Sequence, residues 1–251
     1  MSQPADTPPK RNKVIDLVII VVLMGIGGAA LVSKVGRNEP VRFSDQQIQA
    51  SDRVLLKTAE QNLALATPIS LLQARDGFAE ILGRYPEFPP AIGQMALSRA
   101  LILHLRLAPS PNGWALVARE SRSVLQTFPN QKDALLAAAW AAFYDENKPD
   151  QANQMAQSAQ KQQRYNPLAL VLQANIADAK GKPKLAIRFS ETLALQEPNA
   201  MWLRLTGCRL HVKYSQWERA ASSCKWAAKP EPSHPEATEL LAIAKANLPK
   251  R

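Results

Sequence analysis

The segment Lys180–Pro198, KGKPKLAIRFSETLALQEP, has the pattern of two helices joined by a short turn. Gly181 is suited to the turn, because glycine adopts left-handed backbone conformations at no steric cost. Pro183 is suited to the first turn of the second helix, where no backbone N–H donor is needed. Pro198 cannot continue that helix, so the helix is expected to end beside it.

The same pattern recurs at a spacing of 34 residues in both directions. Ala186 has Ala152 before it and Ala220 after it, and Pro198 is matched by Pro232. Lys182-Pro183 is likewise preceded by Lys148-Pro149. A fixed period of this length corresponds to one helix–turn–helix unit. The pattern resembles the tetratricopeptide-repeat (TPR) family, in a membrane-anchored bacterial form, and the resemblance implies stacked helix hairpins that act as a binding scaffold.

The predicted fold class is all-α, with an N-terminal transmembrane helix followed by a TPR-like α-solenoid. Low glycine content and few aromatic residues, together with abundant alanine and leucine, favour helix over sheet. The expected organisation is a disordered tail at 1–13, the transmembrane helix at 14–33, a linker at 34–43, degenerate helical hairpins at 44–130, TPR-like repeats at 131–232 and a C-terminal capping helix at 233–251.

Residues 14–33 form an apolar run in which Asp16 is the only ionisable side chain. Twenty helical residues extend about 30 Å, which matches the hydrocarbon thickness of a bilayer. A single-pass anchor is therefore predicted, and a signal peptide cleaved near Gly28-Ala29-Ala30 is the alternative. Gly25 and Ala29 form a small-x-x-x-small pair that could support a homodimer in the membrane.

The orientation of this span is predicted with the N-terminus in the cytoplasm. Three cations precede the span, closely grouped between Lys10 and Lys13, and three more dispersed cations follow it. The C-terminal part is then expected in the periplasm, anchored in the inner (cytoplasmic) membrane. A domain facing the cytosol remains the alternative orientation.

Cys208 and Cys224 are the only two cysteines of the chain. A helix hairpin that turns near Gln216 places them symmetrically, eight residues on either side, on facing antiparallel helices. A disulfide is therefore predicted, which requires an oxidising compartment. Two buried free thiols acting as small apolar residues are the alternative, and two cysteines without patterned histidines fall short of a metal site.

Catalytic motifs are missing from the sequence, so we predict that the protein is not an enzyme and needs no metal or cofactor. His104, His211 and His234 are widely spaced and belong to no nucleophile motif. The chain has no glycine-rich phosphate loop, no G-x-S-x-G and no H-E-x-x-H.

The first helix of each unit lines a concave groove in TPR proteins, and the resemblance carries this role to two helices of this chain. Trp and Arg are frequent binding hot spots. By resemblance, the candidate groove residues are Asn175, Asp178, Trp202, Leu205, Arg209 and Lys213. Packing of Trp202 and Leu205 against the neighbouring repeat is the alternative interpretation of those two positions.

The predicted function is a membrane-tethered scaffold that binds protein partners and supports a bacterial envelope complex. Secretion machines, pili, cytochrome c maturation and translocon-associated chaperoning are the settings that the resemblance implies. The formal net charge of +10 leaves open a binder of anionic polymer or lipid, although no nucleic acid is expected as a partner. A non-catalytic subunit of an envelope enzyme is a further alternative, as is an enzyme site assembled between repeats.

Overall fold

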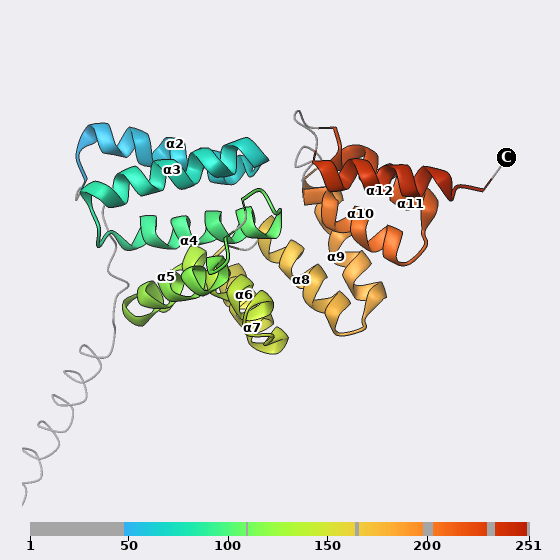
Figure 1. Cartoon of the computed structure of the whole chain (residues 1–251). Helices are drawn as coiled ribbons and strands as arrows, with labels where there is room; N and C mark the ends of the chain where they lie inside the picture. The colour runs from blue at the N-terminus through green and yellow to red at the C-terminus, as the bar shows by residue number, and fades with distance from the viewer. Residues whose placement is uncertain (1–47, 109, 164–165, 198–202, 230–233, 250–251) are drawn as a thin grey trace, which may run out of the picture. The chain divides into compact units, whose positions relative to one another are not determined.

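The computed structural model of the chain describes residues 48–249, except 109, 164–165, 198–202 and 230–233. These residues belong to one compact unit, Ser44–Arg251. Their regular secondary structure is helical, as the composition predicts (Figure 1). The described helices are α2 Ala50–Leu65, α3 Pro68–Arg84, α4 Pro89–His104, α5 Gly113–Thr127, α6 Lys132–Tyr144, α7 Pro149–Gln162, α8 Pro167–Ala179, α9 Pro183–Gln196, α10 Arg204–Lys213, α11 Trp217–Ala227 and α12 Pro235–Ala246.

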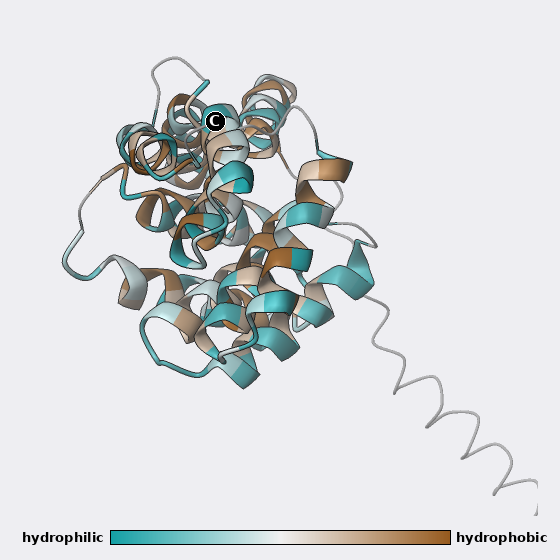
Figure 2. Ribbon diagram, turned by 90° about the vertical axis from the view of Figure 1, so that its right-hand side faces the viewer, coloured by the Kyte–Doolittle hydropathy of each residue, from teal (hydrophilic) through white to brown (hydrophobic). Residues whose placement is uncertain are grey.

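Consecutive helices pair into hairpins, namely α2/α3, α4/α5, α6/α7, α8/α9 and α10/α11, and α12 packs on α10 and α11. The first helix of one hairpin also contacts the first helix of the next, as α4 does with α6. The same helices carry both hydrophobic and hydrophilic residues (Figure 2). The apolar sides meet because a single hairpin cannot bury them alone.

Prolines begin several of the described helices, as predicted for Pro149 of α7 and Pro183 of α9. Each occupies the first turn, where its missing N–H leaves no hydrogen bond unmade. The first described helix, α2, has Gln49 as its N-cap.

Three equivalent turns share one backbone conformation although only one contains glycine. Asn147, Gly181 and Ser215 have φ values of 50°, 65° and 56°. In each turn the next residue donates a backbone hydrogen bond to the carbonyl oxygen of a residue in the last turn of the preceding helix, as in Lys182 N to Ala177 O at 2.9 Å. This bond pattern closes a helix through a left-handed residue. The repeat geometry therefore imposes the left-handed state even on Ser215.

Small residues allow the paired helices to approach closely. Ala152, Ala186 and Ala220 lie on α7, α9 and α11, and all three have 0% exposure. Trp140 on α6 departs from this rule, because the equivalent position on α8 is Ala174. The large ring is also fully buried. It packs on His104 of α4, with the ring centroids 4.6 Å apart.

No helix within the described ranges is long and apolar enough to cross a membrane. The predicted span at 14–33 lies outside those ranges, as do the tail, the linker and the Gly25–Ala29 pair. The membrane anchor therefore stays a prediction from the sequence.

Candidate functional site

The charged groove residues predicted on α8 and α10 form ion pairs within the chain. The carboxylate of Asp178 accepts hydrogen bonds from Lys213 Nζ at 2.9 and 2.7 Å and from the Tyr214 hydroxyl at 2.5 Å. The hydrogen bond to Asp178 raises the pKa of Lys213. Both side chains thus stabilise the contact between successive first helices.

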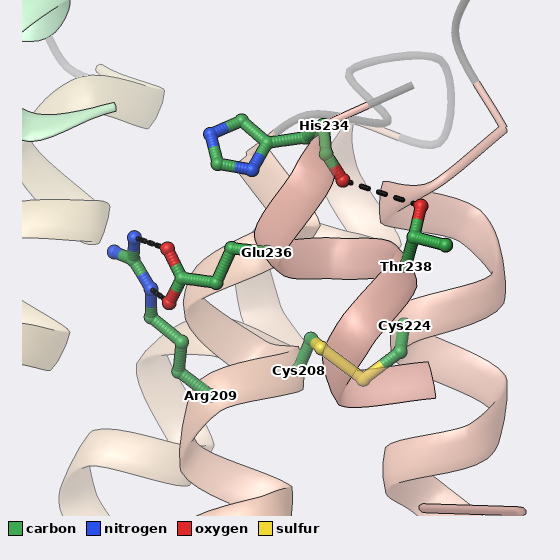
Figure 3. The surroundings of a disulfide bond; sticks show 6 residues. All are labelled: Cys208, Arg209, Cys224, His234, Glu236 and Thr238. Carbon is green, nitrogen blue, oxygen red and sulfur yellow. Dashed lines mark hydrogen bonds and ion pairs between the residues drawn. A yellow bond between two sulfur atoms is a disulfide. The ribbon is translucent and has the colours of Figure 1, made fainter. Parts of the chain in front are cut away.

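Arg209 makes a two-pronged contact with Glu236 at the start of α12 (Figure 3). Its Nε lies 2.6 Å from Oε1 and its Nη2 lies 2.5 Å from Oε2. These hydrogen bonds lower the pKa of the Glu236 carboxyl. Paired guanidinium–carboxylate contacts are the stronger kind of ion pair, so Arg209 holds the capping helix on α10.

The other predicted groove residues are placed differently from one another. Leu205 is 2% exposed and belongs to the core, as the alternative interpretation proposes. Asn175 is half-buried, and its Nδ2 has no hydrogen-bond partner within the part of the chain that the structure describes. Trp202 lies outside the described residues. Binding of a partner by these residues stays a prediction.

The Cys208–Cys224 disulfide is present and joins α10 to α11 (Figure 3). The two Cα atoms are 4.7 Å apart, and both side chains have 0% exposure. The symmetric spacing about the turn at Gln216 identifies the pair from the sequence. Because the sulfur atoms are buried, the bridge is a structural element of the hairpin.

An aromatic cluster around His104 is a feature that the sequence patterns did not reveal. The Nδ1 atom of His104 is 3.1 Å from the Tyr144 hydroxyl, and the Tyr144 ring stacks on Trp114 with centroids 4.9 Å apart. Burial lowers the pKa of His104 to about 3 and raises that of Tyr144 to about 12. Both groups are therefore neutral near pH 7, which fits a packing role rather than proton transfer.

His234 links distant parts of the compact unit. Its Nε2 atom is 3.0 Å from the carbonyl oxygen of Leu105, 129 residues earlier. The ring is 8% exposed, and it precedes α12. His211 instead contacts Gln216 Oε1 through Nδ1 at 2.9 Å, and burial lowers its pKa. The three histidines thus have separate structural partners, and no group of three possible metal ligands occurs among the described residues.

An open pocket of about 470 Å³ is lined by residues of five successive hairpins and of the caps of their helices. We call it the groove pocket. Its lining comes mainly from the first helices of the hairpins and from the residues that cap them. The lining residues are Glu60, Leu63, Ala64, Ala66, Gln94, Leu97, Lys132, Asp133, Gln163, Asn166, Pro167, Leu168, Glu197 and Leu203.

Equivalent positions of the repeat bring these residues together. Glu60 and Gln94 are 34 residues apart, and Gln94 Nε2 donates to Glu60 Oε1 at 2.9 Å. The same spacing relates Asp133 to Pro167. Because stacked units place equivalent positions side by side, one surface collects contributions from several hairpins. This signal was available in the sequence, but the spacing alone does not say which positions stay open.

The cap of α8 orients one wall of the groove pocket. Asn166 Oδ1 accepts hydrogen bonds from the backbone N–H groups of Leu168 at 3.0 Å and Ala169 at 3.2 Å. A side-chain acceptor at this position satisfies donors that a helix leaves free. The bonds fix the start of α8, so Leu168 is held at the pocket wall.

The charged residues of the groove pocket are mostly acidic. Among the described residues that line it, Glu60, Asp133 and Glu197 are acidic and Lys132 is the one cation. Burial raises the pKa of Asp133, the nearby Lys132 opposes this shift and the Glu60 charge adds to it. Lys132 Nζ also donates to Gln163 Oε1 at 3.1 Å. The pocket therefore holds an excess of acceptor groups over an apolar floor.

Two other described pockets gather residues from fewer hairpins. A wide hollow of about 620 Å³ lies between α5 and the turn after α6, where Glu146 pairs with Arg122 and Lys148. A smaller one of about 230 Å³ lies between α9, α10 and α11. The groove pocket is distinguished by its contributions from all five hairpins.

No protein-family model matches the sequence, and no curated protein matches it either. Solved structures do match. The crystal structure of a thermophilic TPR protein of Thermus thermophilus is similar at a TM-score of 0.54 and 16% identity, covering 78% of this chain and 98% of that one. At this identity the likeness concerns the fold, and it agrees with the 34-residue hairpins. The described part of the chain therefore has a TPR-like fold.

Proposed function

We propose that the protein is a non-catalytic scaffold that binds other proteins through the groove pocket. One observation carries the proposal: five successive hairpins contribute to a single open pocket. Its size and its apolar floor with a few polar groups suit recognition of a short segment. A TPR-like fold supports protein–protein interaction as the general role.

The scaffold is further proposed to be tethered to the inner membrane of a bacterium with its helical domain in the periplasm. The apolar run at 14–33 supports the tether. The buried Cys208–Cys224 bridge supports an oxidising compartment. In that place the protein would assist assembly or stability of an envelope complex, of the kinds named from the family resemblance.

Site-specific photo-crosslinking in intact cells tests the scaffold role. The full chain is produced with p-benzoylphenylalanine in place of Leu168, which lines the groove pocket. The matched control carries it in place of Leu195 on α9, a leucine that is 83% exposed and does not line the groove pocket. Irradiation is followed by purification and mass spectrometry.

A defined protein adduct at Leu168 that is missing at Leu195 is the expected result. Adducts at Leu195 alone, or identical adducts at both positions, contradict binding through the groove pocket. Labelling of cysteines introduced beside the span, with a membrane-impermeant maleimide, tests the orientation separately. Labelling on the side of the helical domain only in permeabilised cells contradicts the periplasmic location.

A further inference from the structure

The described lining of the groove pocket is acidic, whereas the protein as a whole is basic. The chain has a formal net charge of +10, yet the described residues that line the pocket include three acids and one base. A local reversal inside a pocket favours an occupant of the opposite charge, since complementary charges select among partners.

The pocket also has more hydrogen-bond acceptors than donors. Gln94 Nε2 donates to Glu60 Oε1 at 2.9 Å, and Gln94 also opposes the rise in the pKa of Asp133, so its amide acts on both carboxylates. Its Oε1 atom is buried and has no partner among the residues that the structure covers. Carboxylates accept several hydrogen bonds each. The pocket thus offers acceptors, which a donor-rich group can satisfy.

Lysine and arginine side chains match that need. An ammonium group brings three N–H donors and a guanidinium brings five, and neither has an acceptor. Their aliphatic stems also bury well against apolar surface. Leu63, Leu97, Leu168 and Leu203 supply such a surface beside the carboxylates.

Burial of Asp133 supports the same conclusion from the energetic side. Desolvation makes its ionised form costly, as the raised pKa records. Three groups face Asp133. The charge of Glu60 on α2 raises the pKa of Asp133 further. Gln94 on α4 and Lys132 on α6 lower it. A bound cation would offset the remaining cost. Retention of a costly acid in a pocket is typical of a functional position.

The size of the pocket limits what can enter. About 470 Å³ accommodates side chains and a short stretch of backbone rather than a folded domain. We propose that the groove pocket binds an extended segment of a partner protein through a Lys or Arg side chain that pairs with Asp133 and Glu60. This inference rests on the proposed scaffold function and specifies the partner's chemistry.

The test selects peptides without assuming a sequence. The full chain in lipid nanodiscs is panned against a phage library of random dodecapeptides, and the selected peptides are synthesised with a fluorophore. Affinities are measured by fluorescence anisotropy for the wild type, Asp133→Asn and Glu60→Gln. Glu239→Gln on α12 is the matched control, because Glu239 is exposed and does not line the pocket. Thermal unfolding checks that each variant is folded.

Selected peptides are expected to share a Lys or Arg. Their affinity should fall about tenfold or more in Asp133→Asn and less in Glu60→Gln, because Glu60 is exposed. It should not change in Glu239→Gln. For the wild type, affinity should rise with pH as Asp133 ionises, and Asp133→Asn should remove most of this rise.

A blocking variant separates failure of the inference from failure of the scaffold proposal. Ala64→Trp places a large ring at an exposed position of the pocket wall. Peptides that lose binding in Ala64→Trp but carry no cation, or are unaffected by Asp133→Asn, overturn the cation inference and leave the scaffold role intact. If no selected peptide depends on Ala64, both the inference and the groove pocket as the binding site are overturned.

Discussion

Two regions on the first helices of the hairpins differ in how their polar side chains are paired. The carboxyl-terminal halves of α8 and α10 carry Asp178, Arg209 and Lys213, and each pairs with another residue of the chain. The amino-terminal ends of α6 and α8 border the groove pocket, where burial raises the pKa of Asp133. Repeat positions thus supply candidate binding residues, and local pairing decides which of them remain available.

The largest effect on stability is expected at the disulfide, which lies in the region where side chains are paired within the chain. Replacing both cysteines in the Cys208→Ala/Cys224→Ala variant should lower the free energy of unfolding by about 3 kcal/mol, because the bridge restricts the unfolded chain. Urea denaturation of the full chain measures the change, and reduced wild type should behave similarly. Peptide affinity at the groove pocket should stay within about twofold. A large loss of affinity would show that the two regions are coupled.

The Arg209–Glu236 pair should contribute less than the disulfide to the free energy of unfolding. Arg209→Ala is expected to cost about 1 kcal/mol, since both side chains are only partly buried at 24% and 27% exposure. Folding lowers the pKa of Glu236, so this stabilisation is present above its ordinary value of 4.5 and is lost as the pH falls through the folded-state value. A double-mutant cycle with Glu236→Gln, followed between pH 7 and 3, measures it. A coupling energy that does not decrease as the pH is lowered would contradict the assignment.

A smaller cost is expected for Lys213→Ala, about 0.5 kcal/mol, because Lys213 is 55% exposed and solvent screens its pair with Asp178. Folding raises the Lys213 pKa, so its contribution is complete below 10.5 and declines as the pH rises through the folded-state value. Arg219→Ala, which breaks an exposed pair with Glu191, is the matched control. Chemical denaturation at pH 7 should give similar small losses for both.

The smallest effect on stability is expected at the groove pocket. There a substitution should stabilise the protein rather than destabilise it. Asp133→Asn should leave stability at pH 7 unchanged or raise it, because the ionised carboxylate is desolvated. Folding raises the Asp133 pKa, so the wild type loses stability relative to the variant as pH rises from 3.8 through the folded-state value. Thermal unfolding of both proteins at pH 4 and pH 7 measures this. A clear destabilisation at pH 7 would mean that Asp133 is already well paired within the fold.

Helix boundaries were largely predictable because the signals are local. Proline at a first helical turn acts through its own ring and its missing N–H, whatever the tertiary context. The left-handed turns were predictable only at Gly181. Asn147 and Ser215 adopt the same conformation because the repeat geometry demands it. Trp140 was recognisable as a departure from the repeat, but its burial against His104 depends on how α4 and α6 pack.

The candidate site was less predictable than the fold. The family resemblance indicated first helices as the binding surface, and the groove pocket does lie mainly on them. It did not indicate that Arg209 contacts Glu236, which lies 27 residues later in the chain. Nor did it indicate that Leu205 is buried. Side-chain pairing between helices is set by distances of a few ångströms, and a repeat period does not specify these.

By itself, the sequence determined the 34-residue hairpin period, the helix starts and the cysteine pair, because each follows from spacing or from the chemistry of single residues. The apolar run at 14–33 is likewise a property of composition, and the anchor that it predicts is still to be tested. Only the tertiary structure decided which polar side chains are paired and which face an open pocket. The reason is that Glu60, Gln94 and Asp133 belong to different hairpins and meet only when the hairpins stack.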